Sequence, residues 1–292
     1  MVIALLFRIS SEKIPMWRGW NSLTVEDKLP VQNIGYMQVI PASPTQLNVV
    51  HLTMQQAELV RKECGERYML TTYDLAVSKP ALRIQETESP KLDKLFIETG
   101  PFHSEEAAWA SVGYYITMSG LDELYVTAEC LGPGSLPGFL EGRNYNRDVR
   151  VHPIGMAALK ELHLREFLKL EYPEHNGQVP RNVKQSLLDI AEKHADDINV
   201  VNEALSDEKS PLMIHLNKYL AYCDDTRSGK HGLTPRYYWG YNDMVQNQLH
   251  SQRGLRTNDT NLFTYSFGKT IPLYWAANRS NYKRWAIKFW LQ

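Results

Sequence analysis

Two carboxylates and an imidazole follow short apolar runs in one part of the sequence. Asp74 comes directly after Arg67–Tyr73, a run whose β-branched and aromatic residues are typical of a buried strand. Glu98 follows a second apolar run, and His103 stands shortly after it. In open α/β sheets the loops at the strand ends converge on one crevice, so we expect these three side chains to lie together there. Carboxylates and imidazoles are groups that bind metal ions or transfer protons, so this stretch is the candidate site.

Each of these residues also has a structural interpretation. An Asp at the end of a strand more often caps a helix or stabilises a turn than binds a metal. Glu98 stands before Thr-Gly-Pro, where a carboxylate can simply face solvent. His103 opens a predicted helix and is a candidate cap or packed edge. Glu129 ends another predicted strand and competes with Glu98 for the second acidic position.

The elements expected to position these residues alternate between strand and helix. A helix capped by Thr53 precedes the first strand, and a strand over Leu95–Ile97 follows the second helix. Because Pro80 is tolerated only in the first turn of a helix, that second helix is expected to begin at Ser78. The alternation predicts an α/β sheet. It is completed by a helix over Ser104–Ser119, capped by Ser104, and by a third strand over Leu121–Ala128.

The rest of the chain has different residue patterns. Met1–Ser43 is irregular except for one short strand over Asn33–Ile40, and Gly132–Arg150 is rich in glycine and proline, which predicts a loop. From His152 onward the patterns are mainly helical. We therefore expect an N-terminal extension over residues 1–48, an α/β core over 49–172 and a mainly helical, truncated region over 173–292.

Composition narrows the classes of protein. The formal net charge of −1 gives no global basic field for nucleic acid or an anionic membrane. Three widely separated cysteines form neither a metal spacing nor a disulfide framework, and no stretch approaches the length of a membrane span. We expect an intracellular protein, nuclear or cytoplasmic rather than secreted, without a membrane partner. Nothing in the sequence predicts the oligomeric state.

Local basic groups remain as candidate phosphate contacts. Arginine binds phosphate oxygens in a bidentate manner and tyrosine stacks on exposed bases, which makes Arg143, Tyr145, Arg147 and Arg150 the nucleic-acid candidates. The alternative is that these arginines pair with nearby acids such as Glu141 and Asp148. Lys283 and Arg284 belong to a second basic stripe of near-helical spacing, which is either a solvated face or an edge that touches nucleic acid.

Four phrases together resemble a known group of proteins. They are Thr-Tyr-Asp-Leu-Ala at 72–76, Gly-Pro-Phe-His at 100–103, Glu-Gly-Arg-Asn-Tyr-Asn-Arg at 141–147, and Asn-Arg-Ser-Asn-Tyr-Lys-Arg-Trp at 278–285. Their order and spacing resemble a group of animal proteins derived from mobile elements, which is similar to DDE-type transposases with a ribonuclease-H-like core. The similarity spans most of the chain.

The resemblance implies a ribonuclease-H-like sheet with flanking helices, followed by a mainly helical C-terminal region. It implies a divalent metal, Mg²⁺ or Mn²⁺, held by Asp74 together with Glu98 or Glu129, with His103 as auxiliary group and DNA as partner. Relatives often carry an acid where this chain has Pro101, and their third carboxylate is expected on a helix that this chain does not reach. The implied function is thus a nuclease or strand-transfer domain that is incomplete or inactive. The alternative is a non-catalytic module of the same fold that binds DNA or protein and needs no cofactor.

Overall fold

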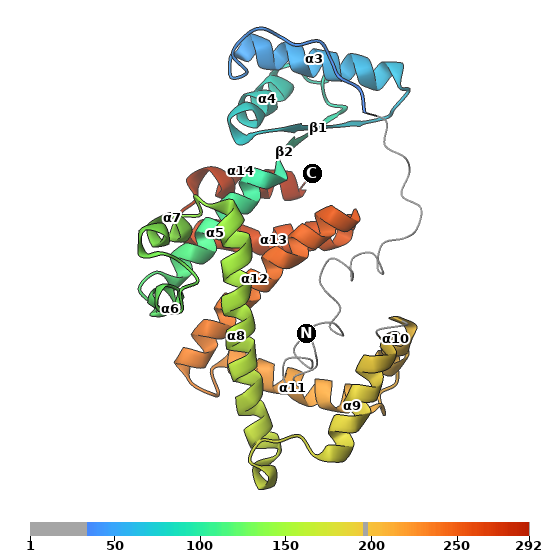
Figure 1. The fold of residues 1–292 in the computed structure, drawn as a ribbon. Coiled ribbons are helices and arrows are strands. Elements are labelled where there is room, and N and C mark those ends of the chain that lie inside the picture. The colour runs from blue at the N-terminus through green and yellow to red at the C-terminus, as the bar shows by residue number, and fades with distance from the viewer. Residues whose placement is uncertain (1–33, 195–197, 292) are drawn as a thin grey trace. The chain divides into compact units, whose positions relative to one another are not determined.

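A computed structural model describes residues 34–194 and 198–291, and these divide into two compact units whose chain segments are interleaved (Figure 1). The unit here called the sheet unit contains residues 34–114, 137–145 and 267–291. The unit here called the helical unit contains residues 115–136, 146–194 and 198–266. The chain therefore enters and leaves each unit more than once.

The described residues are mostly helical, with 72% of them in helices and 4% in strands. In the described residues the strands are β1 (Met69–Tyr73) and β2 (Leu95–Thr99), which pair in parallel. The expected ribonuclease-H-like sheet with flanking helices is therefore wrong. The segment predicted as a third strand, Leu121–Ala128, forms a helix instead.

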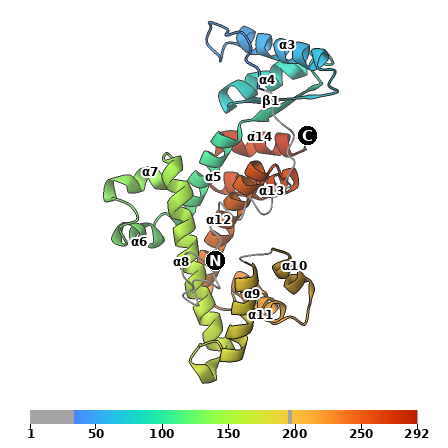
Figure 2. The ribbon, with the colours of Figure 1, turned by 45° about the vertical axis from the view of Figure 1, so that its right-hand side comes forward.

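The sheet unit begins with α3 (Leu47–Glu63), β1, α4 (Leu75–Thr87), β2 and α5 (Pro101–Ile116). It also holds α7 (Leu136–Leu140), the last part of α13 (Thr260–Ala276), and α14 (Ser280–Leu291). Figures 1 and 2 show α3 and α4 on the same side of the two strands and α14 beside β2. The core between them is apolar and is formed by Val50, Met54, Ala57, Ala81, Leu82, Leu92, Leu95 and Ile97, with Trp285 of α14 packed against it.

Three helices of the sheet unit begin earlier than the sequence predicts. α3 starts at Leu47, so Thr53 lies inside it and donates its hydroxyl proton to the carbonyl of Val50. α4 starts at Leu75 with Asp74 as its N-cap, so Pro80 lies inside the helix rather than in its first turn. α5 begins with Pro101, since proline suits the first helical position, and Ser104 is a buried residue of that helix rather than its cap.

The helical unit contains the longest helices and no strand among its described residues. Its elements are α6 (Leu121–Thr127), η2 (Pro133–Ser135), α8 (Tyr145–Glu171), η3 (Pro173–His175), α9 (Arg181–His194), α10 (Ile198–Ser206), α11 (Pro211–Ser228), α12 (Leu233–Thr257) and the first part of α13. Helices α9, α10 and α11 pack on one another, and α11 packs on α12 (Figure 2).

The predicted third strand is instead helix α6. Gly120 takes a left-handed conformation before it, with φ of 85°. The carboxylate of Asp122 accepts the backbone N–H groups of Met118 at 2.8 Å and Gly120 at 3.1 Å. A carboxylate in the first turn suits the positive end of the helix, so the prediction failed because local capping outweighed the strand-like composition.

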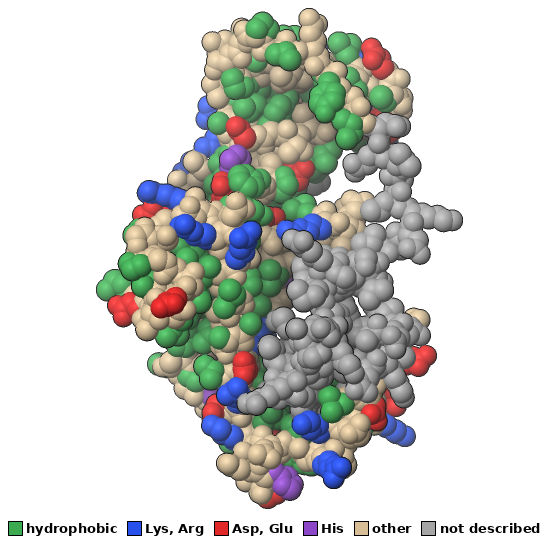
Figure 3. Space-filling model, viewed as in Figure 1, with side chains coloured by type: hydrophobic (Ala, Val, Ile, Leu, Met, Phe, Trp, Pro, Cys, Tyr) green, Lys and Arg blue, Asp and Glu red, His purple; other side chains and the backbone are tan. Residues whose placement is uncertain are grey.

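The predicted loop also becomes helical near its end. α8 begins at Tyr145, so Arg147 and Arg150 stand on a helix rather than on a loop. Charged groups of both signs are interspersed where α8, α9 and α11 lie in Figure 3. Exposed ion pairs such as Lys169–Glu166 at 2.6 Å account for part of this mixture. Such pairs contribute little to stability because solvent screens them.

Candidate functional site

The carboxyl ends of β1 and β2 form one polar edge of the sheet unit. Because the strands are parallel, Thr72 lies opposite Glu98 and Tyr73 opposite Thr99. The ladder continues one residue further, where the N–H of Gly100 donates to the carbonyl of Tyr73 at 2.6 Å. The structure therefore brings Glu98 and the end of β1, where Asp74 follows, to the same edge.

Asp74 and Glu98 also belong to the same face of the two strands. Residues in register on parallel neighbours share a face, and the hydroxyl of Thr72 donates to Oε2 of Glu98 at 3.2 Å. Asp74 comes two residues after Thr72, and side chains alternate with a period of two, so it continues the Thr72 face. Asp74 and Glu98 therefore lie at the carboxyl ends of neighbouring strands.

Glu98 is a half-buried carboxylate with little compensation for its charge. Burial raises its pKa, and the hydrogen bond from Thr72 opposes that shift. Among the described residues Glu98 has no ion pair. Desolvation without a nearby cation disfavours the charged form, so positive charge placed at this edge would stabilise the Glu98 carboxylate.

Asp74 caps α4, as its structural interpretation expects. Its backbone is extended, with φ of −68° and ψ of 166°, and its Oδ1 accepts the N–H of Val77 at 2.9 Å. The residue is exposed, and its Oδ2 accepts no hydrogen bond from the part of the chain that the structure describes. Asp74 can therefore cap α4 through Oδ1 and still bind another group through Oδ2.

His103 and Tyr282 extend this edge. Nδ1 of His103 lies 2.9 Å from Oε2 of Glu106 on α5, and both side chains are partly exposed. Burial raises the pKa of Tyr282 to about 12, and the charges of Glu106 and Asp74 add to the effect. The Tyr282 hydroxyl therefore keeps its proton at neutral pH. We call Asp74, Glu98, His103, Glu106 and Tyr282 the strand-end site.

Sequence reasoning missed Tyr282, although it noted the Asn-Tyr-Lys-Arg phrase that contains it. That phrase was the feature of the sequence that could have identified Tyr282. Because Tyr282 is far from Asp74 along the chain, the sequence did not show that the two residues are close in space. The structure brings α14 to α4, because Nζ of Lys79 donates to Oδ1 of Asn281 at 2.5 Å. The residue that follows Asn281 is then held near Asp74.

Glu129 is not part of the strand-end site. It belongs to the helical unit, where it is exposed and takes a left-handed conformation with φ of 56° just after α6. Within residues 34–194 and 198–291, no three His, Cys, Asp or Glu side chains are grouped so that they could hold a metal ion. A cation at the strand-end site would therefore have at most two of these side chains as ligands, and its remaining ligands would have to be water or substrate oxygens.

The arginine candidates divide into paired and unpaired groups. Arg143 lies 2.5 Å from Glu141, which is the structural alternative for this residue. The Tyr145 hydroxyl donates to Glu105 at 2.5 Å, and its ring packs 4.9 Å from that of Phe102, so it is tied to α5 rather than open for stacking. Arg147 and Arg150 are exposed, and neither forms an ion pair with a described residue.

Lys283 and Arg284 stand near the start of α14. Nζ of Lys283 lies 4.9 Å from the ring centre of Trp275, which is 51% exposed, and 3.2 Å from Oδ1 of Asn278. Arg284 is exposed. A cationic side chain, Lys283, therefore lies over a half-exposed indole ring at the α13–α14 connection, in the same unit as the strand-end site.

The helical unit contains a buried polar cluster that resembles a catalytic group in composition. Tyr125 and Tyr241 share a hydrogen bond of 2.7 Å between their hydroxyls, and the Tyr241 hydroxyl lies 3.0 Å from Nδ1 of His152. His152 is fully buried, and burial lowers its pKa to about 3. Gly155 leaves room for this cluster, because a Cβ there would lie 1.8 Å from the Tyr125 hydroxyl. The cluster is closed to solvent and therefore structural.

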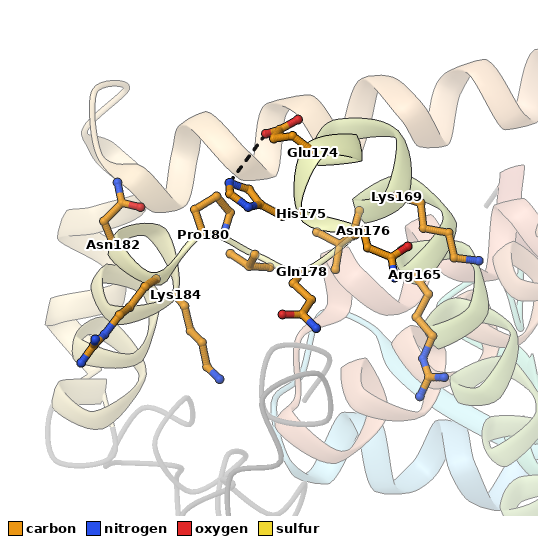
Figure 4. A pocket seen from close by; sticks show the side chains of 13 residues that line it. Arg165, Lys169, Glu174, His175, Asn176, Gln178, Pro180, Asn182 and Lys184 are labelled. Carbon is orange, nitrogen blue, oxygen red and sulfur yellow. Dashed lines mark ion pairs between the residues drawn. The ribbon is translucent and has the colours of Figure 1, made fainter.

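A broad groove of about 1260 Å³ lies at the corner between α8 and α9 (Figure 4). Arg165, Gln178 and Lys184 point into the same open space, while His175 lies 3.9 Å from Glu174. Arg165 and Lys169 already pair with Glu161 and Glu166. None of the sequence-predicted site residues lines this groove.

Comparison with known proteins gives a family. The family described as a domain of unknown function, DUF8702, matches residues 16–292, so the chain belongs to it. No curated protein and no solved structure matches. None of the helices in the described ranges has both the length and the apolar character needed to cross a membrane.

Proposed function

We propose that the strand-end site binds a divalent cation, Mg²⁺ or Mn²⁺, and through it the phosphate groups of a nucleic acid. The observation that carries the proposal is Glu98, a half-buried carboxylate at the carboxyl edge of β1 and β2 without a cationic partner among the described residues, with Asp74 following β1 at the same edge. Binding of a cation would remove the cost that burial imposes on the charged form of Glu98.

The donor set suits magnesium-like ions. Mg²⁺ commonly binds through one or two carboxylates and completes its octahedron with waters and substrate phosphates. Glu98 and the second oxygen of Asp74 supply two carboxylate ligands of this kind. Because no third protein ligand is grouped with them in the described residues, affinity for the free ion should be low and should rise when phosphate is present.

Neighbouring groups would act on the bound phosphate. A divalent cation supplies Lewis-acid activation for phosphodiester cleavage. Tyr282, which stays protonated, can donate a hydrogen bond at this edge, and Glu106 holds the His103 ring through a contact of 2.9 Å. The proposal is therefore cation-dependent binding of nucleic acid, with cleavage or strand transfer as the activity to be assayed.

The test is calorimetric titration of Mn²⁺, with and without a single-stranded oligonucleotide, into the wild type, Glu98→Gln and Asp74→Asn. Asparagine is as good a helix cap as aspartate, so Asp74→Asn removes the charge and keeps α4 capped. We expect each variant to lose cation binding by at least about tenfold, or roughly 1.4 kcal/mol. Glu129→Gln in the helical unit is the matched control. Equal binding by all four proteins would refute the proposal.

A second candidate function is a module that binds nucleic acid without a cation. The observation that favours it is the contact between Lys283 and the half-exposed ring of Trp275, with the exposed Arg284 next to Lys283 in the sequence. Single strands are held without sequence preference by base stacking on aromatic rings beside cationic groups. Chelation separates the two functions. Oligonucleotide binding that survives EDTA but is lost in Trp275→Ala supports the second function, and binding lost with EDTA supports the first.

A further inference from the structure

One extended segment of the sheet unit exposes an unusual number of apolar side chains. Residues 34–40 have no regular secondary structure, and Ile34, Tyr36 and Val39 are 78%, 96% and 83% exposed. No described residue pairs with this segment as a strand. Among the described residues, its one backbone hydrogen bond is local, from the N–H of Ala42 to the carbonyl of Ile40 at 2.8 Å. Contiguous exposed apolar residues of this kind mark an interaction site.

The outer edge of β1 is a second feature of the sheet unit that is open to another strand. In a parallel ladder, alternate residues bond to the same neighbour. Met69 donates to Lys94 at 3.0 Å and the Tyr73 carbonyl accepts from Gly100, so Met69, Thr71 and Tyr73 face β2. Leu70 and Thr72 then direct their backbone groups away from β2, where no other described strand lies. The Leu70 side chain is 60% exposed.

These two features are complementary. A two-stranded sheet has only marginal stability by itself, and the unpaired edge of a sheet can hydrogen-bond to another strand. The segment contains Ile, Tyr, Met and Val, has no charged residue and is followed by Pro41, which is the composition of a short strand with a defined end. Figure 3 shows hydrophobic side chains open to solvent in the part of the molecule where α3 and β1 lie.

We propose that residues 34–40 of one copy of this chain add as a third strand to the free edge of β1 in a second copy. Within the described residues of each copy, the segment 34–40 and the outer edge of β1 both lack a strand partner, so the exchange is reciprocal and closes as a two-fold dimer. The main-chain hydrogen bonds of Leu70 and Thr72 give the affinity, and the apolar side chains of the segment cover Leu70 of the partner copy. This dimer does not depend on the strand-end site or on its cation.

Sedimentation equilibrium of the full chain over a range of concentrations tests the proposal. We expect a monomer–dimer equilibrium that Val39→Pro and Leu70→Lys each weaken at least about tenfold, or roughly 1.4 kcal/mol. Val39→Pro keeps the segment apolar but removes a backbone N–H, so it separates strand pairing from simple hydrophobic association. Met118→Lys changes a side chain that is 92% exposed in the helical unit and is the matched control.

Hydrogen exchange gives an independent result. The amides of Leu70 and Thr72 should become protected as the concentration rises, and this protection should be absent in Val39→Pro. A chain that stays monomeric at every soluble concentration overturns the proposal. So does a dimer that Val39→Pro leaves intact, or protection of these two amides that does not depend on concentration, since the last result would mean that the segment pairs within its own copy.

Discussion

Two clusters of the same residue types behave differently in the two units. In the helical unit, His152, Tyr241 and Tyr125 form a buried chain of hydrogen bonds from which solvent is excluded. In the sheet unit, His103, Tyr282 and their acidic neighbours lie at a strand edge that solvent reaches. Residue type alone therefore does not identify a functional group. Burial and the presence of charged neighbours distinguish a structural cluster from an accessible site.

The largest effect is expected when an extra side-chain atom is introduced into the buried cluster of the helical unit. Gly155→Ala places a Cβ where the Tyr125 hydroxyl lies, so we expect the free energy of unfolding to fall by about 3 kcal/mol. Urea denaturation measures the change. Gly134→Ala is the control, because a Cβ there meets no atom within 4 Å. If both variants are equally stable, the cluster is looser than the contacts indicate.

Acid should weaken the buried cluster next. The pKa of His152 is lowered to about 3 by burial, against 6.5 for an exposed histidine, so between these pH values the unfolded state binds a proton that the folded state does not. Stability is thus retained above pH 6.5 and is lost as the pH falls toward 3, by about 1.4 kcal/mol per pH unit for this residue. Urea titrations at pH 7 and pH 5 measure it. His152→Asn should be less stable at both pH values but should show a shallower difference between them.

At the accessible cluster the helix cap gives a smaller effect. Asp74→Ala removes the acceptor of the Val77 N–H and should cost about 1 kcal/mol, whereas Asp74→Asn should cost only a few tenths. The same urea titrations measure both. Equal losses in the two variants would mean that the charge of Asp74, rather than its hydrogen bond, stabilises α4.

The smallest effect on stability is expected at Glu98. A raised folded-state pKa means that the stabilisation it brings is present at low pH and is lost as the pH rises through that pKa. Glu98→Gln should therefore leave stability at neutral pH unchanged or slightly higher, within about 0.5 kcal/mol. Thermal unfolding at pH 7 measures it. A large loss would show that Glu98 is structural, and the contrast between the two clusters would disappear.

Local signals in the sequence were reliable where neighbouring residues decide the structure. β1, β2 and the placement of Asp74 at a strand end followed from apolar runs and from the residue that succeeds them. The third strand failed because Asp122 caps the backbone before Leu121 and stabilises a helix, and the loop before Arg150 failed because α8 begins as early as Tyr145. Tyr282 was missed because only tertiary packing brings it to Asp74.

The interleaving of the two units has a consequence for synthesis. The buried core of the sheet unit comes from residues 50–97, and Trp285, which follows nearly all of the helical unit in the sequence, packs against that core. On a ribosome, domains fold from the N-terminal side as the chain emerges. The strands and helices over residues 47–99 can therefore collapse early, and the side of β2 that faces α14 is covered only once α14 has been made. No contiguous fragment of the chain contains the whole of either unit, so neither can be produced by simple truncation.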